Sequence, residues 1–213
     1  MSLYMKNNFC KICFKEITKI SLFGFANKDN LLCEDCFSKF KAKWNKFHLG
    51  NVQGTAIYDY DELIKELIYK FKGCYDYELK DVFLYRYINY LRIIYRGYYI
   101  VPAPSYHIDD QKRGFNHVQS IFESLKLKML PIISKKTDHK QSSLNSRGRI
   151  SIHDVLKIDE NISLKGKKIL LVDDIFTTGS TMQTCIDLLR KQGARKIKIL
   201  VVAKTVLKEK TEY

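Results

Sequence analysis

The chain has 213 residues, of which 46% are hydrophobic, 10 are Gly and 3 are Pro; this composition is typical of one α/β domain with a small extra module and excludes a disordered chain. Its net charge of +14 would attract polyanions such as nucleic acid, phosphorylated ligands or an anionic membrane face, although a solvated basic surface would have the same charge. No apolar run approaches the roughly 18 residues that span a bilayer, and residues 1–9 lack a signal core, so we expect a soluble cytoplasmic protein without a membrane span.

Two CxxC pairs lie near the N-terminus, with 19 residues between them: Cys10 with Cys13, and Cys33 with Cys36. Four thiolates in a tetrahedral array suit Zn²⁺ or, less often, an iron–sulfur cluster. A thiol–disulfide role is the alternative, but the pairs lack the βαβ context of a thioredoxin-like motif. The spacing therefore predicts a metal site that supplies much of the folding energy of a small unit.

A basic helix is predicted directly after the second pair, over Phe37–Phe47. It would carry Trp44 and four lysines: Lys39, Lys41, Lys43 and Lys46. Such a helix, together with the Tyr- and Arg-containing stretch at residues 85–99, would offer stacking and phosphate contacts to single-stranded DNA, unless these aromatic residues pack against the rest of the protein. We expect a zinc-binding module over residues 1–50 and a second domain over residues 51–213.

The second domain alternates predicted strands and helices, which indicates right-handed crossovers and a parallel sheet. The predicted strands are Val52–Tyr58 (at an edge), Tyr98–Ala103, Ile169–Val172 and Ile197–Val202. The predicted helices are one capped by Asp61 or Asp59 and ended by Gly73, then Tyr77–Tyr95, Val118–Leu125 and Met182–Leu189. A long polar loop is expected at Ser134–Ser151.

The segment Asp173–Thr181 joins an apolar strand to a helix and holds the main candidate site. Its hydroxyls, the small Gly179 and the free N–H groups of a helix start suit a phosphate monoester. Asp173 and Asp174 suit the vicinal hydroxyls of a ribose, or Mg²⁺ held through waters. A Walker B segment is excluded because no GxxxxGK[ST] loop precedes it, which leaves an ordinary capped turn as the alternative.

Three further groups are candidates. Arg113 follows a strand broken by Pro102 and Pro104 and could pair with phosphate oxygens, or it could be a solvated residue of a surface turn. The basic loop from Lys135 to Arg149 could close over a leaving group, or it could be a solvated charge run. His117 and His139 are candidate acid–base groups.

Several of these segments resemble known motifs. Val172–Thr181 resembles the phosphoribosyl-pyrophosphate motif of type I phosphoribosyltransferases. Val101–Pro104 followed by Arg113–Asn116 resembles the VPxP…RGFN signature of the ComF family of competence proteins. The helix within Asp61–Tyr77, the Gln141…Leu144…Arg149 loop and the paired CxxC motifs also resemble that family, so the resemblance covers nearly the whole chain.

This resemblance implies an α/β type I phosphoribosyltransferase fold, amidophosphoribosyltransferase-like, with a small N-terminal four-cysteine zinc module. It implies catalytic roles for Asp173, Asp174 and Arg113, with Mg²⁺ at the two aspartates. The residues implied to bind phosphoribosyl pyrophosphate are Asp173, Asp174, Thr177, Thr178, Gly179, Ser180, Thr181, Ala103, Pro104, Lys136 and Lys140.

Two functions agree with this resemblance. The chain is either a phosphoribosyltransferase with an unnamed acceptor or an inactive adaptor or sensor; in both cases it handles single-stranded DNA during natural transformation, with a competence helicase and a recombinase-loading protein as implied partners. Four positions depart from the family pattern: His117 stands where the family usually has Gln, Asp109 and Asp110 lie in an approach that is usually Arg-rich, and Ile152 stands where Asn is usual.

Overall fold

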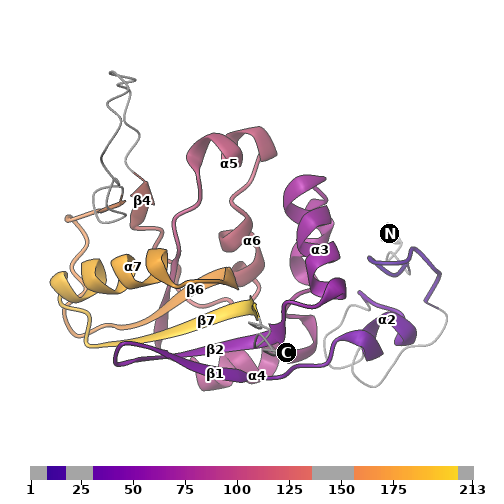
Figure 1. Cartoon of the computed structure of the whole chain (residues 1–213), viewed down its shortest axis with the longest axis horizontal. Helices are drawn as coiled ribbons and strands as arrows, with labels where there is room; N and C mark the ends of the chain where they lie inside the picture. Colours follow the sequence, from indigo (N-terminus) through magenta and orange to yellow (C-terminus); the bar gives the residue numbers. More distant parts are fainter. Residues whose placement is uncertain (1–8, 18–30, 136–155, 206–213) are drawn as a thin grey trace, which may run out of the picture.

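The computed structural model describes residues 9–17, 31–135 and 156–205, and its centre is a five-stranded sheet (Figure 1). The strand order is β1-β2-β7-β6-β3, in which β1 is antiparallel to β2 and all other neighbours are parallel. These strands are β1 (Asn45–Leu49), β2 (Val52–Asp59), β3 (Tyr98–Pro102), β6 (Lys168–Phe176) and β7 (Lys196–Lys204). A separate antiparallel pair consists of β4 (Ile133–Lys135) and β5 (Leu156–Ile158). The predicted α/β fold with a mostly parallel sheet is confirmed.

Helices cover both faces of the sheet. The α-helices are α2 (Glu34–Lys39), α3 (Glu62–Gly73), α4 (Ile88–Ile94), α5 (His107–Arg113), α6 (His117–Glu123) and α7 (Ser180–Lys191), and two short 3₁₀ helices are η1 (Tyr77–Asp81) and η2 (Tyr85–Tyr87). Alternate residues of β6 belong to two different hydrophobic cores. Leu170 packs in the core formed with α3, α4 and α6, whereas Leu171 packs in the core formed with α7. Both faces of the central strands are therefore buried, which explains their nearly continuous apolar sequences.

The ligand edge of the sheet is set by strand direction. The arrows of β6 and β7 in Figure 1 point toward the side where α3 and α6 lie, so the loop after β6 opens beside these helices. The predicted cap of α3 is confirmed, because the Asp61 carboxylate accepts a hydrogen bond from the N–H of Ile64 at 2.9 Å. In the part of the chain that the structure describes, no helix combines the length and apolarity needed to cross a membrane.

The predicted helix Phe37–Phe47 is wrong. Helix α2 ends at Lys39, and residues 45–49 form strand β1 instead. Phe40 and Phe47 have a helical spacing in the sequence, but they pack on opposite faces of the sheet, Phe40 beside Tyr58 and Phe47 beside Phe176. A backbone that delivers them to opposite faces cannot be one helix.

Two other predictions need correction, and one helix was missed. Strand β2 is not at an edge, because β1 covers it. The predicted helix Tyr77–Tyr95 is broken into η1, η2 and α4, and helix α5 was not predicted. The division at residue 50 stays a prediction, although β1 already belongs to the main sheet; most of the expected polar loop, residues 136–155, lies outside the described residues.

Candidate active site

The loop after β6 turns sharply at Gly179, directly before α7. Gly179 has a φ of +79°, and a Cβ atom there would lie 2.9 Å from the ring of Phe176, so the turn requires glycine. The side chains of Thr177, Thr178 and Ser180 are exposed, and the Thr178 and Ser180 hydroxyl oxygens lie 3.2 Å apart. Because N–H groups in the first turn of a helix lack partners within it, this loop presents donors and hydroxyls to one place.

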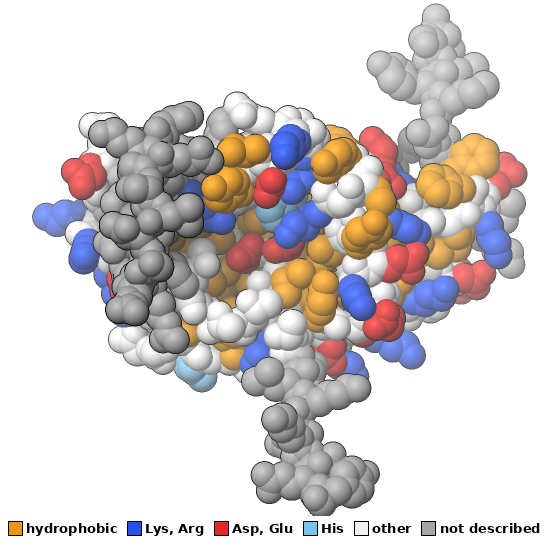
Figure 2. Space-filling view, turned by 45° about the horizontal axis from the view of Figure 1, so that its top comes forward, with side chains coloured by type: hydrophobic (Ala, Val, Ile, Leu, Met, Phe, Trp, Pro, Cys, Tyr) orange, Lys and Arg blue, Asp and Glu red, His pale blue; other side chains and the backbone are white. Residues whose placement is uncertain are grey.

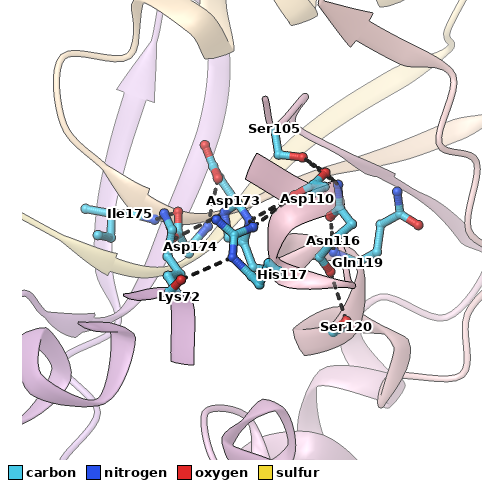
Figure 3. Close-up of polar contacts among 11 residues, drawn as sticks. Lys72, Ser105, Asp110, Asn116, His117, Gln119, Ser120, Asp173, Asp174 and Ile175 are labelled. Atoms are coloured by element: carbon cyan, nitrogen blue, oxygen red, sulfur yellow. Dashed lines mark hydrogen bonds and ion pairs between the residues drawn. The ribbon is translucent and has the colours of Figure 1, made fainter. Parts of the chain in front are cut away.

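Asp174 is buried at the end of β6 and is held from two helices (Figure 3). Its Oδ2 atom lies 2.7 Å from Nζ of Lys72, at the end of α3, and 3.7 Å from Nε2 of His117, at the start of α6. Burial acts to raise the pKa of Asp174, but the charge and hydrogen bond of Lys72, together with His117 and Asp173, outweigh it, so the pKa is lowered. Asp174 is therefore an ionised carboxylate with a fixed orientation.

Asp173 has the opposite electrostatic setting. Its carboxylate accepts a hydrogen bond from the N–H of Asp174 at 2.9 Å, and among the residues that the structure describes it takes part in no ion pair. Burial raises its pKa well above the usual range, and the neighbouring charge of Asp174 raises it further. A cation or the hydroxyl donors of a ligand would relieve this cost, which makes Asp173 the side chain best suited to receive them.

Arg113 is engaged by the protein rather than free for a ligand. Its guanidinium donates to Asp110 Oδ1 at 2.9 Å, to the Lys72 carbonyl at 3.2 Å and to Nδ1 of His117 at 3.2 Å, and its side chain is only 8% exposed. Asp110 also accepts a hydrogen bond from Asn116, at 2.8 Å. The predicted catalytic role of Arg113 stays a prediction; in this structure Arg113 braces α5 and α6 against α3.

His117 is neutral at ordinary pH. Burial lowers the pKa of its imidazole to about 4, against the opposing effect of Asp174. Because arginine can only donate, Nδ1 of His117 accepts from Arg113, and the remaining proton of the neutral ring sits on Nε2, which faces Asp174. The geometry therefore favours a positioning role for His117 over the acid–base role considered from the sequence.

Two cavities lie near the candidate site. One, of about 840 Å³, is lined by residues of α3 together with Ile175, and Lys72 reaches it. The other, of about 720 Å³, is lined by Ala103, Pro104, Ser105 and Asn116 with residues of β4 and β5. Figure 3 shows Asp173 and Asp174 between the Lys72 side and the Ser105 side, and Figure 2 shows acidic side chains in the hollow of this face.

The site residues predicted from the sequence are thus partly brought together. The turn Ala103–Pro104 lies beside β6, because the N–H of Ala103 donates to the Val172 carbonyl at 2.8 Å. The exposed hydroxyl loop lies at the end of the same strand. Lys136, Lys140 and His139, with Ile152, lie outside the described residues, so their predicted roles stay predictions.

The four N-terminal cysteines come together as predicted. Their Sγ atoms lie within 4.8 Å of one another, and those of Cys13 and Cys33 are 3.6 Å apart, close to the roughly 3.8 Å expected for two ligands of a tetrahedral zinc with 2.3 Å bonds. Burial acts to raise the pKa of Cys10, but backbone N–H groups outweigh it and lower the pKa to about 7. Burial raises the pKa of Cys36, a penalty that a coordinated cation would remove. The cluster is compatible with zinc.

Comparison with known proteins agrees with this geometry. The sequence profile of the phosphoribosyl transferase domain matches residues 111–212. A competence protein ComFC of Streptococcus pneumoniae is 28% identical over 89% of this chain and 96% of its own length. A competence protein ComFC of Bacillus subtilis is 25% identical over 86% of this chain and 78% of its own. The chain is thus similar to ComF competence proteins over most of its length.

Solved structures are more distant. Hypoxanthine phosphoribosyltransferase from Trypanosoma cruzi is 13% identical, covers 64% of this chain and 73% of its own, and has a TM-score of 0.42. Because that score is low, the fold assignment rests on the order of the sheet and on the matching domain profile.

Lys72 and Asp110 are site residues that sequence reasoning missed. Lys72 stands in the segment that resembles the ComF helix, but only the packing of α3 beside β6 brings it to Asp174. Asp110 was noted only as a departure from the ComF pattern, and the structure shows that it compensates the charge of Arg113. His117, another departure from that pattern, occupies the space between these two ion pairs.

Proposed function

We propose that this chain binds phosphoribosyl pyrophosphate with Mg²⁺ at the carboxyl edge of the sheet and transfers its phosphoribosyl group to an acceptor. The observation that carries this proposal is the joining of the Asp173–Asp174 pair to the hydroxyl-rich turn at Gly179, at the start of α7. The turn binds the 5-phosphate through hydroxyls and N–H groups, and the aspartates accept hydrogen bonds from the ribose hydroxyls.

We propose that the pyrophosphate of this ligand and the acceptor lie toward different cavities. The cavity beside Ala103 and Pro104 also holds Lys135 and Lys157, whose charges suit a pyrophosphate. Carboxylate oxygens are the donors that Mg²⁺ prefers, so the aspartates fit this ion, which would neutralise charge on the pyrophosphate. Nε2 of His117 carries a proton in the neutral ring and is unsuited to bind the ion.

The proposed reaction breaks the bond between C1 of the ribose and the pyrophosphate oxygen and forms a bond from C1 to an acceptor nucleophile. The protein contributes by positioning the ligand and stabilising charge. Asp174, which is held by Lys72 and His117, is preorganised for this task because it does not have to reorient when the ligand arrives.

A second candidate function is an adaptor or sensor that binds the ligand without turning it over. The engagement of Arg113 by Asp110 favours it, because the predicted catalytic cation is neutralised and largely buried. In either case we propose that the protein handles single-stranded DNA during natural transformation, since curated relatives are named competence proteins. A helicase and a recombinase-loading protein are proposed partners.

We also propose that the cysteine cluster holds one zinc ion per chain. Elemental analysis of the purified protein should give about one zinc, and the Cys33→Ser with Cys36→Ser variant should give none. A brown protein with iron and sulfide, or a full zinc content in the variant, would contradict this assignment.

The ligand proposal is tested by thermal unfolding with Mg²⁺ and phosphoribosyl pyrophosphate. At a ligand concentration about 100 times Kd, mass action should add roughly 2.7 kcal/mol to the free energy of unfolding and raise Tm by several degrees. The Thr178→Val with Ser180→Ala variant removes two exposed hydroxyls and should lose most of this rise. The control Ser163→Ala, at the other end of β6, should keep it.

No rise in Tm for the unchanged protein would overturn the proposal. If the rise occurs, pyrophosphate release during incubation with a cell extract distinguishes the two candidates. Release that depends on Asp173 supports the transferase, whereas binding without release supports the adaptor.

A further inference from the structure

Four lysines project from one face of the sheet near the amino ends of its parallel strands. Lys46 lies opposite Thr55, whose neighbour in β7 is Leu200; Lys196 and Lys198 precede Leu200 by four and two residues and share its face. Lys168 is the neighbour of Lys196 in the next strand. We call Lys46, Lys168, Lys196 and Lys198 the basic strip.

Tyrosine rings lie between these lysines. Nζ of Lys168 is 5.9 Å from the ring centre of Tyr98, Nζ of Lys198 is 6.0 Å from that of Tyr95, and the two rings pack edge to face at 5.7 Å. Nζ of Lys46 donates to the Thr55 hydroxyl at 3.0 Å. Contacts with rings and a hydroxyl hold the ammonium groups at the surface without neutralising them.

Within the described part of the chain, the lysines of the basic strip are not paired with acids. Among the residues that the structure describes, none of its lysines takes part in an ion pair; the ion pairs lie on α3, around Lys11 and in the candidate active site. Adjacent strands are about 4.8 Å apart, so from β1 to β6 the strip crosses roughly 14 Å of sheet. A row of cations at this spacing would attract a partner that carries repeated negative charges.

Aromatic side chains adjoin one end of the strip. Tyr90 is 52% exposed and packs at 5.3 Å against Trp44, which lies two residues before Lys46. An exposed ring beside a row of cations offers a surface on which an unpaired base can stack while its phosphates meet the lysines. Bases inside a duplex are already stacked and would not use this ring.

We propose that the basic strip binds a single strand of nucleic acid, with phosphates on the lysines and a base on Tyr90. This inference rests on the DNA-handling part of the proposed function and replaces the predicted contact through a helix at Phe37–Phe47. Lys168 begins β6 and Asp173 lies five residues later, about 17 Å along the strand, so the strip and the phosphoribosyl site are at opposite ends of the sheet and bind independently.

The test compares two variants that each remove two exposed lysines: Lys168→Gln with Lys196→Gln in the strip, and Lys41→Gln with Lys43→Gln in the segment predicted from sequence. Binding of a labelled oligothymidine is measured by fluorescence anisotropy over a range of salt concentrations. The strip variant should bind about tenfold more weakly at low salt, and the slope of log K against log salt should shrink by about 1.4, or 0.7 for each lost phosphate contact. The control should change little.

Tyr90→Ala should weaken binding about tenfold at every salt concentration and leave the slope unchanged, because stacking releases no counterions. The rise in Tm with phosphoribosyl pyrophosphate checks that each variant is folded. Three results would each overturn the proposal for the basic strip. These are equal losses of affinity in the two lysine variants, a larger loss of affinity in the control, and equal binding of duplex and single strand. If the unchanged protein binds no oligothymidine but keeps its Tm rise, the DNA-handling proposal falls with the strip and the ligand proposal stands.

Discussion

At the carboxyl ends of the parallel strands, Lys72 and Arg113 each meet a carboxylate, whereas at the amino ends Lys168 and Lys196 meet solvent and a tyrosine ring. The first pair is partly or largely buried, and its ion pairs are therefore weakly screened by salt. The second pair is exposed, and its attraction for anions falls steeply as salt rises. One sheet thus separates a site of fixed geometry from a surface of uncompensated charge.

This difference shows why net charge alone is a poor guide to function. The +14 of the chain says nothing about where cations are compensated. At the carboxyl edge, added salt should barely affect the orientation of Asp174. At the amino edge, salt should control binding. Variants at the carboxyl edge measure how far the site depends on its matched charges.

The largest effect is expected from His117 and pH. Its pKa is about 4 in the folded protein and near 6.5 when unfolded, so the unfolded chain binds the proton first as pH falls. The contribution of the neutral imidazole to the free energy of unfolding is complete above pH 6.5 and is lost as pH falls toward 4. Relative to His117→Gln, the protein should lose about 3 kcal/mol of unfolding free energy between pH 7 and pH 4.

Chemical denaturation at each pH measures this difference, because all other titrating groups are common to both proteins. The exposed His48, changed to Gln, serves as the matched control for the substitution itself. A constant difference between His117→Gln and the unchanged protein over this range would show that His117 is not held neutral by burial.

A smaller effect is expected from Asp174→Ala. The change leaves the Lys72 ammonium without its partner, but this side chain is 32% exposed and can turn toward water, so we expect a loss of about 2 kcal/mol, below the usual 3–5 for a fully buried pair. Asp59→Ala, which removes a hydrogen bond to Asn45 at the end of β2, should cost about 1 kcal/mol.

The two variants should also differ in how their Tm responds to added ligand. Asp174→Ala should lose the Tm rise with phosphoribosyl pyrophosphate, and Asp59→Ala should keep it. Equal losses of stability together with equal Tm rises would mean that the contact between Lys72 and Asp174 has no role in the site.

Local patterns in the sequence predicted much of the fold. The cap at Asp61 and the apolar spacing after it gave α3, and the short apolar runs gave the buried strands at β3, β6 and β7. These succeed because capping and burial depend on residues close together in the chain. The loop at Gly179 could be predicted for the same reason, since its hydroxyl-bearing residues and the glycine are contiguous in the sequence.

The failures share a different cause. Phe40, Trp44 and Phe47 have a helical spacing, yet tertiary packing draws them to different sides of the sheet. Lys72 became a site residue only because α3 packs beside β6, 102 positions away in the chain. The basic strip is likewise a product of register, because Lys168 and Lys196 become neighbours only when their strands pair. Contacts of this kind leave no local signal.

The smallest effect is expected from Asp173→Asn in the absence of ligand, and it has the opposite sign. Burial and the charge of Asp174 raise the pKa of Asp173, so the folded protein is destabilised above the usual carboxyl range, where the group must ionise. Asn keeps the acceptor for the N–H of Asp174 and removes the charge. At neutral pH the Tm of this variant should therefore rise by about 2–4 °C, the shift that 1 kcal/mol produces in a domain of this size.

The Asp173→Asn variant should also lose most of the further rise in Tm with Mg²⁺ and phosphoribosyl pyrophosphate, because the carboxylate proposed to bind them is gone. Gain of stability with loss of binding would identify Asp173 as a residue kept at a cost for its ligand. If the variant is less stable than the unchanged protein yet still binds the ligand, Asp173 has a structural role and not a ligand-binding one.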